Sequence, residues 1–411
     1  MLRWLRILVT ALAAVMGIGM LVIAALLWLR LSQPPLAPGA AYDYDFPLDR
    51  PGTNWMHSHH GLQEQRLMAA PLIVRDPAEA GADIQDIVVL FHDFTFRDPD
   101  EILAELKGPS VPTGGMDHSA MGHGAAAMST GPHLQDVVYD AFLANDRTLD
   151  DPEVFRVERG GRLRLRLINA ANARIFVLGL FGLEGWTMAL DGMPLPAPEP
   201  LEEVLVLGPG QRADLIVDVI AEQGSTAYLA RADEARGTPQ VSFQVRGQAS
   251  LARRGTPDAL PPNPGDAFNL SGDSVDLTLN MEGGAMGTLR GAMLDGEETG
   301  FREMAQANQF WAFNGMVGMP DTPLATLDRG QIARLTISND TAFPHAMHLH
   351  GMHFREVLAD GTLGPMRDTL LMDSAERREI AFAADNPGDW LLHCHMLSHA
   401  VSGMMTWVRV A

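Results

Sequence analysis

The chain has 411 residues, which exceeds one ordinary domain, so two or three compact units are expected. A net charge of −21 argues against nucleic-acid binding and is typical of an acidic, solvated surface. Cys394 is the only cysteine, which excludes an intramolecular disulfide and a Cys-rich zinc site.

The N-terminus predicts a membrane anchor. Residues 7–29 are an uncharged, mostly apolar run of 23 residues, long enough to cross a bilayer as one transmembrane helix. No small-x-small cleavage site closes this run, so residues 1–31 are interpreted as an uncleaved signal anchor rather than a removed signal peptide. Arg3 and Arg6 precede the run, and the positive-inside rule then places everything after Arg30 outside the cytoplasm. We expect attachment to the inner membrane, with the folded domains in the periplasm or at the cell exterior.

The next informative segments are rich in histidine. His57-Ser-His59 is a His-x-His pair, and the residues of such a pair share one face of an extended strand. Residues 108–133 form a flexible insert in which Met and His alternate with Gly and Ala, a composition suited to Cu(I) capture. The alternative is a disordered loop with incidental methionines.

The body of the chain reads as all-β. Short runs of Val, Ile, Leu and Phe, such as 87–91, 163–168 and 204–207, are separated by Gly, Pro and Asp at strand-and-turn spacing. Residues 160–169 and 330–339 look like the same strand recurring in two domains. Repeated β-sandwiches fit this pattern.

Two more histidine segments lie near the C-terminus, after the histidine-free stretch 134–344. The first is His345-Ala-Met-His348-Leu-His350. The second is His393-Cys394-His395, followed by His399 and Met404. On an extended strand His393 and His395 share a face, and Cys394 points away from them. One thiolate, two imidazoles and a weak thioether make a blue-copper site, so Cys394, His399 and Met404 predict one, with His345 as the fourth ligand.

The segments 52–65, 345–351 and 393–404 resemble three of the four copper motifs of multicopper oxidases, and the copper-resistance and laccase-like bacterial members are the most similar in character. The resemblance extends from about Ser32 to Ala411. It implies tandem cupredoxin-like β-sandwich domains, a type 1 copper that takes electrons from a substrate, and a trinuclear cluster that reduces dioxygen to water.

The resemblance also implies a role for each ligand. His345, Cys394, His399 and Met404 would hold the type 1 copper. One type 3 copper would take His59, His350 and His393, the other would take His57 and His395, and His348 would bind the type 2 copper. The backbone of Cys394, flanked by His393 and His395, would be the catalytic electron route between the two sites.

Two departures from the family stand out. The first motif, a His-Trp-His-Gly element, is not in this chain, and the apolar N-terminal run stands where roughly half of a cupredoxin domain is expected. Ala400 occupies a position where related enzymes often carry an acidic residue, so proton delivery would need another donor.

These features give the expected organisation. It comprises the anchor (1–31), a truncated cupredoxin domain (40–107), the Met/His-rich insert (108–133), a second cupredoxin domain (134–250), a linker (251–265) and a third domain with the type 1 site (266–411).

Three functions compete. The leading hypothesis is a membrane-anchored oxidase of Cu(I) or phenol-like donors that uses dioxygen and serves copper tolerance. The second is a copper-binding or electron-transfer protein with an incomplete trinuclear cluster. The third is a non-catalytic periplasmic scaffold of the same fold, against which the complete type 1 ligand set argues.

Overall fold

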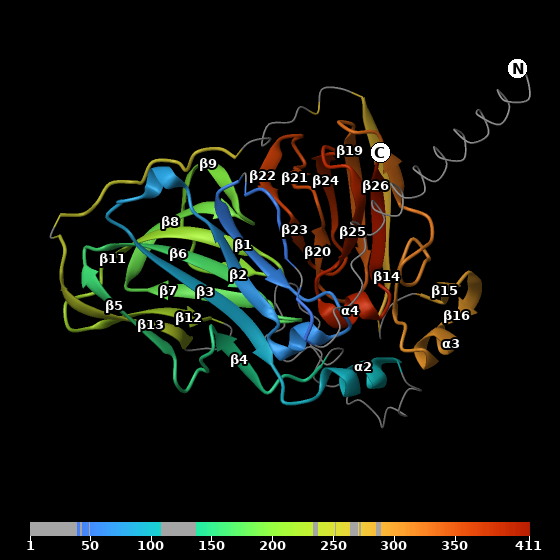
Figure 1. Ribbon diagram of the computed structural model, residues 1–411, viewed down its shortest axis with the longest axis horizontal. Coiled ribbons are helices and arrows are strands. Elements are labelled where there is room, and N and C mark those ends of the chain that lie inside the picture. Colours follow the sequence, from blue (N-terminus) through green and yellow to red (C-terminus); the bar gives the residue numbers. More distant parts are fainter. Residues whose placement is uncertain are drawn as a thin grey trace, which may run out of the picture. The chain divides into compact units, whose positions relative to one another are not determined.

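A computed structural model describes residues 39–41, 43–48, 50–107, 137–232, 237–250, 252–263, 270, 273–284 and 289–411. Leu48–Ala411 forms one compact unit. Two β-sandwiches make up most of it and are coloured blue to yellow-green and orange to red in Figure 1. The prediction of an all-β chain is confirmed.

The first sandwich combines a six-stranded and a five-stranded sheet around one core that contains Phe91, Phe176 and Phe243. In spatial order the six-stranded sheet consists of β4 (Ala141–Ala144), β3 (Gln85–Phe94), β6 (Arg162–Asn169), β11 (Arg212–Val219), β8 (Leu183–Leu190) and β9 (Met193–Pro200). The five-stranded sheet consists of β10 (Leu205–Leu207), β7 (Phe176–Phe181), β12 (Thr226–Arg231), β13 (Thr238–Gln248) and β5 (Glu153–Arg159).

The second sandwich repeats this plan around a core that includes Leu335, Phe382 and Leu392. Its six-stranded sheet consists of β17 (Trp311–Phe313), β14 (Ser274–Gly283), β19 (Ile332–Asp340), β24 (Arg377–Ala383), β21 (Phe354–Val357) and β22 (Leu363–Arg367). Its five-stranded sheet consists of β18 (Ala325–Leu327), β26 (Met405–Val410), β25 (Gly388–Cys394), β20 (His345–Leu349) and β23 (Thr369–Met372).

The internal repeat read from the sequence is confirmed by the sheets. Strands β6 and β19 are the two similar segments, and each is the third strand of its six-stranded sheet. Each pairs in parallel with an earlier strand, β6 with β3 and β19 with β14. Strand β3 falls in the range 40–107 that the sequence assigned to a first domain, yet Val89 and Phe91 pack into the core of the first sandwich. The sheet therefore extends across the boundary expected at residue 107.

Alternation along β6 gives its sheet one apolar and one charged face. Leu163, Leu165 and Leu167 point into the core, whereas Arg164 and Arg166 lie on the opposite face and are also buried. The two-stranded sheet of β1 (Gly52–His57) and β2 (Ala69–Val74) covers this charged face, since Arg166 Nη1 donates to the Thr53 hydroxyl at 3.1 Å. The first histidine segment is thereby attached to the first sandwich.

The remaining elements are short. They are the 3-10 turns η1 (Gln63–Arg66) and η2 (Pro77–Glu79), the helices α2 (Pro99–Lys107), α3 (Phe301–Gln306) and α4 (Leu397–Val401), and the hairpin of β15 (Gly291–Leu294) and β16 (Glu297–Gly300). Of the helices within the described ranges, none has the length and apolar character of a membrane span. The predicted anchor (1–31) and the predicted Met/His-rich insert (108–133) lie outside the described residues.

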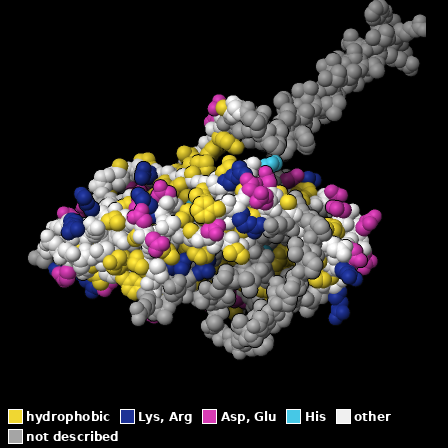
Figure 2. All heavy atoms as spheres, turned by 90° about the horizontal axis from the view of Figure 1, so that it is seen from below, with side chains coloured by type: hydrophobic (Ala, Val, Ile, Leu, Met, Phe, Trp, Pro, Cys, Tyr) yellow, Lys and Arg dark blue, Asp and Glu magenta, His cyan; other side chains and the backbone are white. Residues whose placement is uncertain are grey.

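The surface carries charges of both signs. On the face shown in Figure 2, Asp and Glu side chains are interspersed with Lys and Arg, and apolar side chains lie between them. The described part of the predicted linker, residues 252–263, contains no helix or strand and is tied to the first sandwich, for example by Arg162 Nη2 and the Gly255 carbonyl at 2.7 Å.

Candidate metal centre

The only thiol of the chain lies against two imidazoles. Cys394 Sγ is 3.7 Å from His345 Nδ1 and 3.6 Å from His399 Nδ1, and the two nitrogens are 3.1 Å apart. All three side chains are buried. We call His345, Cys394 and His399 the thiol site; one metal ion could bridge their three ligand atoms.

Strand pairing explains why these residues meet. Strands β20 and β25 are antiparallel neighbours, with Met347 opposite Cys394 and His348 opposite His393. His345 begins β20, Cys394 ends β25, and the short helix α4 that follows carries His399. The predicted ligand Met404 is fully buried in the same core cluster as Cys394. Its carbonyl accepts from the Cys394 N–H at 3.2 Å, and its N–H donates to the His399 carbonyl at 3.0 Å.

Two residues that the sequence analysis did not single out enclose the thiol site. The Trp311 ring lies 4.5 Å from the His399 ring and 5.0 Å from the His345 ring, centroid to centroid. The Thr341 hydroxyl lies 2.8 Å from His345 Nε2. His345 therefore directs Nδ1 toward the sulfur and has Nε2 engaged on its other side. Nothing in the local sequence marks Trp311, because it is 34 residues from the nearest histidine (345 − 311).

Six other histidines gather on the opposite face of β25. We call them the histidine cluster: His57, His59, His348, His350, His393 and His395. His350 Nε2 lies 3.1 Å from His393 Nε2, and the ring centroid of His59 is 4.9 Å from that of His350 and 5.7 Å from that of His393. One ligand atom from each of these three residues lies within 4.8 Å of the others. The structure thus brings together the three residues predicted to share one copper.

The other three histidines are in ring contact with this trio and with each other. The His57 centroid lies 4.9 Å from that of His395 and 4.6 Å from that of His59. The His348 centroid lies 4.7 Å from that of His350 and 5.5 Å from that of His395. The assignment of each imidazole to a particular copper stays a prediction.

Hydrogen bonds at Nδ1 orient several of these rings. The Nδ1 atom of His348 lies 2.9 Å from the Asp368 carbonyl oxygen, and that of His393 lies 2.8 Å from the Cys394 carbonyl oxygen. His57 Nδ1 lies 2.9 Å from a carboxylate oxygen of Glu64. A partner at Nδ1 fixes the ring and leaves Nε2 for a metal. The sequence analysis did not predict this role of Glu64. An acidic residue only seven positions after His57 is a sequence feature that could have indicated a hydrogen-bond partner for the imidazole.

Burial lowers the pKa of six of these imidazoles, which belong to His57, His59, His345, His350, His393 and His395. Burial, with a smaller contribution from the nearby His348, lowers the pKa of His57 to about 4. Burial is also the main reason that the pKa values of His345, His393 and His395 lie well below their ordinary range. A metal ligand must be deprotonated, and a lowered pKa favours the neutral form of these six imidazoles, which is the form that binds a metal.

The described histidines that the sequence left unassigned are not among the residues that could share a metal ion with either group. His60 is exposed, and His92 is buried on β3. His353 Nδ1 lies 3.4 Å from Arg50 Nη1, and its Nε2 lies 4.0 Å from Asp368 Oδ2. His118, His123 and His133 lie outside the described residues.

The donor chemistry fits copper. The thiol site offers one buried thiol, two imidazoles and no carboxylate, and such soft ligands suit copper. The histidine cluster offers imidazoles only, and these suit copper as well. His345, Cys394 and His399 would hold one ion, and the histidine cluster would hold the others. Bound copper supplies reversible one-electron redox chemistry at both places.

Comparisons with known proteins agree with this chemistry. A family model described as multicopper oxidase matches residues 297–411, and another with the same description matches residues 29–79. A family of unknown function matches residues 1–48. The crystal structure of Lac15 from a marine microbial metagenome is 32% identical, with a TM-score of 0.59, over 88% of this chain and 75% of Lac15. The chain belongs to the multicopper oxidase family.

Other relatives support the same assignment. Multicopper oxidase MmcO of Mycobacterium tuberculosis is 29% identical over 90% of this chain and 71% of its own length. Copper resistance protein A of Escherichia coli is 25% identical over 92% of this chain and 81% of its own length. A multi-copper oxidase structure from Pseudomonas thermotolerans, at 24% identity and a TM-score of 0.68, shares the fold. The family consists of copper-dependent oxidoreductases, which confirms the predicted cofactor and enzyme class.

Proposed function

We propose that this multicopper oxidase removes single electrons from Cu(I) or phenol-like donors at the thiol site and reduces dioxygen to water at the histidine cluster. Support comes from Cys394, which belongs to the thiol site while its neighbours His393 and His395 belong to the cluster. One covalent backbone segment therefore connects the two places at which redox chemistry would occur.

The chain's own residues perform distinct tasks in this proposal. The thiol site lies within the core of the second sandwich, so water is excluded from Cys394. The histidine cluster draws on β1, β20 and β25 with the residues that follow them, so the first and second sandwiches must stay docked for it to persist. His59 is exposed and marks the side of the cluster that dioxygen can reach.

A role in copper tolerance is part of the proposal. It is supported by the name of the relative Copper resistance protein A and by the Met- and His-rich composition of residues 108–133. Anchoring in the inner membrane, with the sandwiches in the periplasm, is proposed from residues 7–29 and the arginines before them. Recovery of the full chain in the membrane fraction after a carbonate wash would test the anchor; recovery in the soluble fraction would reject it.

A second candidate function is supported by the make-up of the cluster. Six of the described histidines contribute to it, and the assignment predicted from the sequence gives the type 2 copper only one of them, His348. A copper-binding or electron-transfer protein would need the thiol site but not a complete cluster.

Copper content separates the two candidates. The full chain is purified in detergent, copper per chain is measured, and oxygen uptake is recorded with Cu(I) and with a phenolic donor. More than one copper per chain together with steady uptake supports the oxidase. A single copper with a blue colour and no uptake overturns it in favour of electron transfer.

A further inference from the structure

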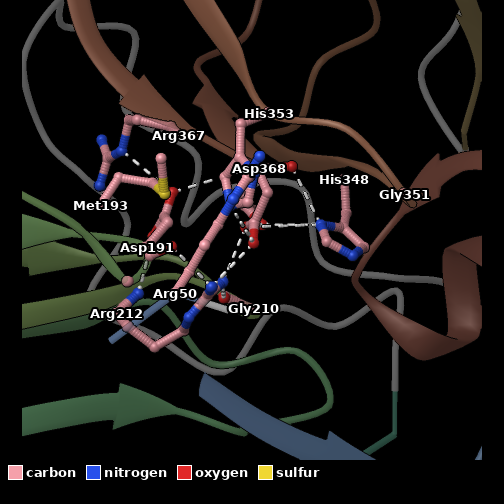
Figure 3. A network of polar contacts seen from close by, with 12 residues as sticks. Arg50, Asp191, Met193, Gly210, Arg212, His348, Gly351, His353, Arg367 and Asp368 are labelled. Carbon is pink, nitrogen blue, oxygen red and sulfur yellow. Dashed lines mark hydrogen bonds and ion pairs between the residues drawn. The ribbon is translucent and has the colours of Figure 1, made fainter. Parts of the chain in front are cut away.

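Arg212 lies at the start of β11 and is buried, with 3% of its surface exposed. A guanidinium has five N–H donors in a fixed planar fork. In this chain all of them find oxygen acceptors from four different residues, several of which Figure 3 shows around Arg212. The acceptors are the carbonyls of Thr53 (3.3 Å), Gly210 (3.0 Å) and Asp191 (2.8 Å) and both carboxylate oxygens of Asp368 (2.7 Å each).

The carboxylate of Asp368 connects Arg212 to His348. Asp368 Oδ1 also accepts from the Thr369 hydroxyl at 2.8 Å, and that hydroxyl oxygen lies 3.0 Å from His348 Nδ1. The Asp368 carbonyl lies 2.9 Å from the same nitrogen and accepts from the Leu349 N–H at 3.1 Å. Asp368 thus binds Arg212 through its carboxylate and orients the His348 ring through its backbone carbonyl.

The Gly210 carbonyl connects Arg212 to His395. Gly210 has a φ of +84°, and a Cβ at this position would lie 2.7 Å from His395 Cδ2. The backbone of this turn therefore packs directly against the imidazole. By holding the Gly210 carbonyl, Arg212 sets how closely the turn approaches the ring.

The Thr53 carbonyl connects Arg212 to the hairpin that carries His57 and His59. Thr53 is completely buried in β1. Two residues later, the Trp55 ring is stacked on His57, with centroids 4.3 Å apart and planes 14° apart. The hairpin is a separate two-stranded sheet and is part of neither sandwich. Hydrogen bonds from the sandwiches to its backbone therefore fix its position.

We propose that Arg212 is a positioning residue for the histidine cluster, because one guanidinium ties together the segments that hold His348, His395 and the β1 hairpin. The inference rests on the proposed function only where it concerns copper. It also concerns the metal-free chain, in which the same segments must already be held together.

Arg164 provides a matched control. It lies on β6 of the same sheet, is similarly buried, and pairs with Asp214 at 2.6 Å and Glu79 at 2.5 Å. None of its hydrogen bonds involves a residue that contacts the histidine cluster. Replacement of either arginine by lysine keeps the charge and removes the planar fork.

The test compares Arg212→Lys, Asp368→Asn and Arg164→Lys in the full chain. Hydrogen exchange is measured on the metal-free proteins, and cluster copper is measured by chelator competition while the blue colour of the thiol site is followed. For Arg212→Lys and Asp368→Asn we expect faster exchange over 52–59 and 345–350 and about 10- to 100-fold weaker cluster copper binding, with the blue colour retained. Arg164→Lys should change neither quantity.

Equal effects of the two lysine variants, or wild-type behaviour of Arg212→Lys, would overturn the proposal. If Arg212→Lys does not fold, Asp368→Asn decides, because it keeps the arginine and the side-chain shape. If the wild type binds a single copper, the oxidase proposal fails, and exchange in the metal-free proteins still decides the role of Arg212.

Discussion

His393 and Cys394 are neighbours in the chain, yet their side chains lie on opposite faces of β25. Cys394 enters the core of the second sandwich together with Met347 and Leu392. His393 faces the other way, where its Nε2 meets that of His350 at 3.1 Å. The thiol site and the histidine cluster thus lie on opposite sides of one strand and are joined by one peptide unit. A ligand of one can therefore be substituted without removing a ligand of the other.

Cys394→Ser should abolish the blue colour and remove about one copper per chain, because an alcohol is a poor substitute for a soft thiolate. The cluster copper should remain, since the six histidines are unchanged. Copper analysis and absorption spectra of the two proteins test this expectation. His350→Ala is the converse variant and should lose cluster copper while the protein stays blue; loss of both metal groups in either variant would contradict the separation.

Gly210→Ala should destabilise the protein and weaken the cluster, because the new methyl group meets the His395 ring at 2.7 Å. Gly224 is a matched control with a φ of +88° and nothing within 4 Å of an added Cβ. Backbone strain should cost about 1 kcal/mol in each variant, and Gly210→Ala should lose roughly 1–3 kcal/mol more through overpacking. Urea unfolding of both variants measures the difference, and equal losses would mean that the turn yields without moving the ring.

Glu64 supports His57 from a buried position, with 2% of its surface exposed. Burial and then the nearby Asp93 carboxylate raise the pKa of Glu64 well above its ordinary value. If His57 held copper through Nε2, its Nδ1 would carry the proton and would donate to Glu64 Oε2, which lies 2.9 Å away.

Glu64→Ala removes this acceptor and should weaken cluster copper by about 10- to 100-fold. Glu64→Gln keeps an acceptor oxygen and should lose much less. Chelator competition gives both affinities, while the blue colour serves as an internal control because Glu64 contacts His57 of the histidine cluster, which is not a ligand of the thiol site. Identical affinities for Glu64→Ala and the wild type would show that Trp55 stacking alone holds His57.

Local patterns in the sequence revealed the strands and the candidate metal ligands. Which residues hold those ligands in place depends on long-range packing. Alternation along an extended strand was enough to separate Cys394 from His393 and His395, because the rule concerns neighbouring residues. The ion pair of Arg212 and Asp368 joins residues 156 positions apart, and no local pattern links them. The pairing of β3 with β6 across residue 107 is long-range in the same way, since it is not encoded in either strand alone.

Trp311 should tune the thiol site, because its ring packs against both imidazoles and is itself 3% exposed. The potential of a type 1 copper depends on the hydrophobicity and contacts around its ligands. Trp311→Leu removes the aromatic surface beside His399, so we expect a shifted reduction potential and blue absorption, with cluster copper unchanged. Trp311→Phe keeps an aromatic ring and should shift both less.

A control for general destabilisation is Trp407→Leu. Trp407 lies on β26, the strand paired with β25. Its Nε1 donates to the Pro320 carbonyl at 2.8 Å, and Arg409 lies over its ring. Each Trp→Leu change should cost up to about 3 kcal/mol of unfolding free energy, but only the change at Trp311 should move the potential. Redox titration of the blue band decides: an equal shift in both variants would assign the effect to loosened packing of the second sandwich, and no shift in Trp311→Leu would show that Thr341 and the core alone fix the two imidazoles.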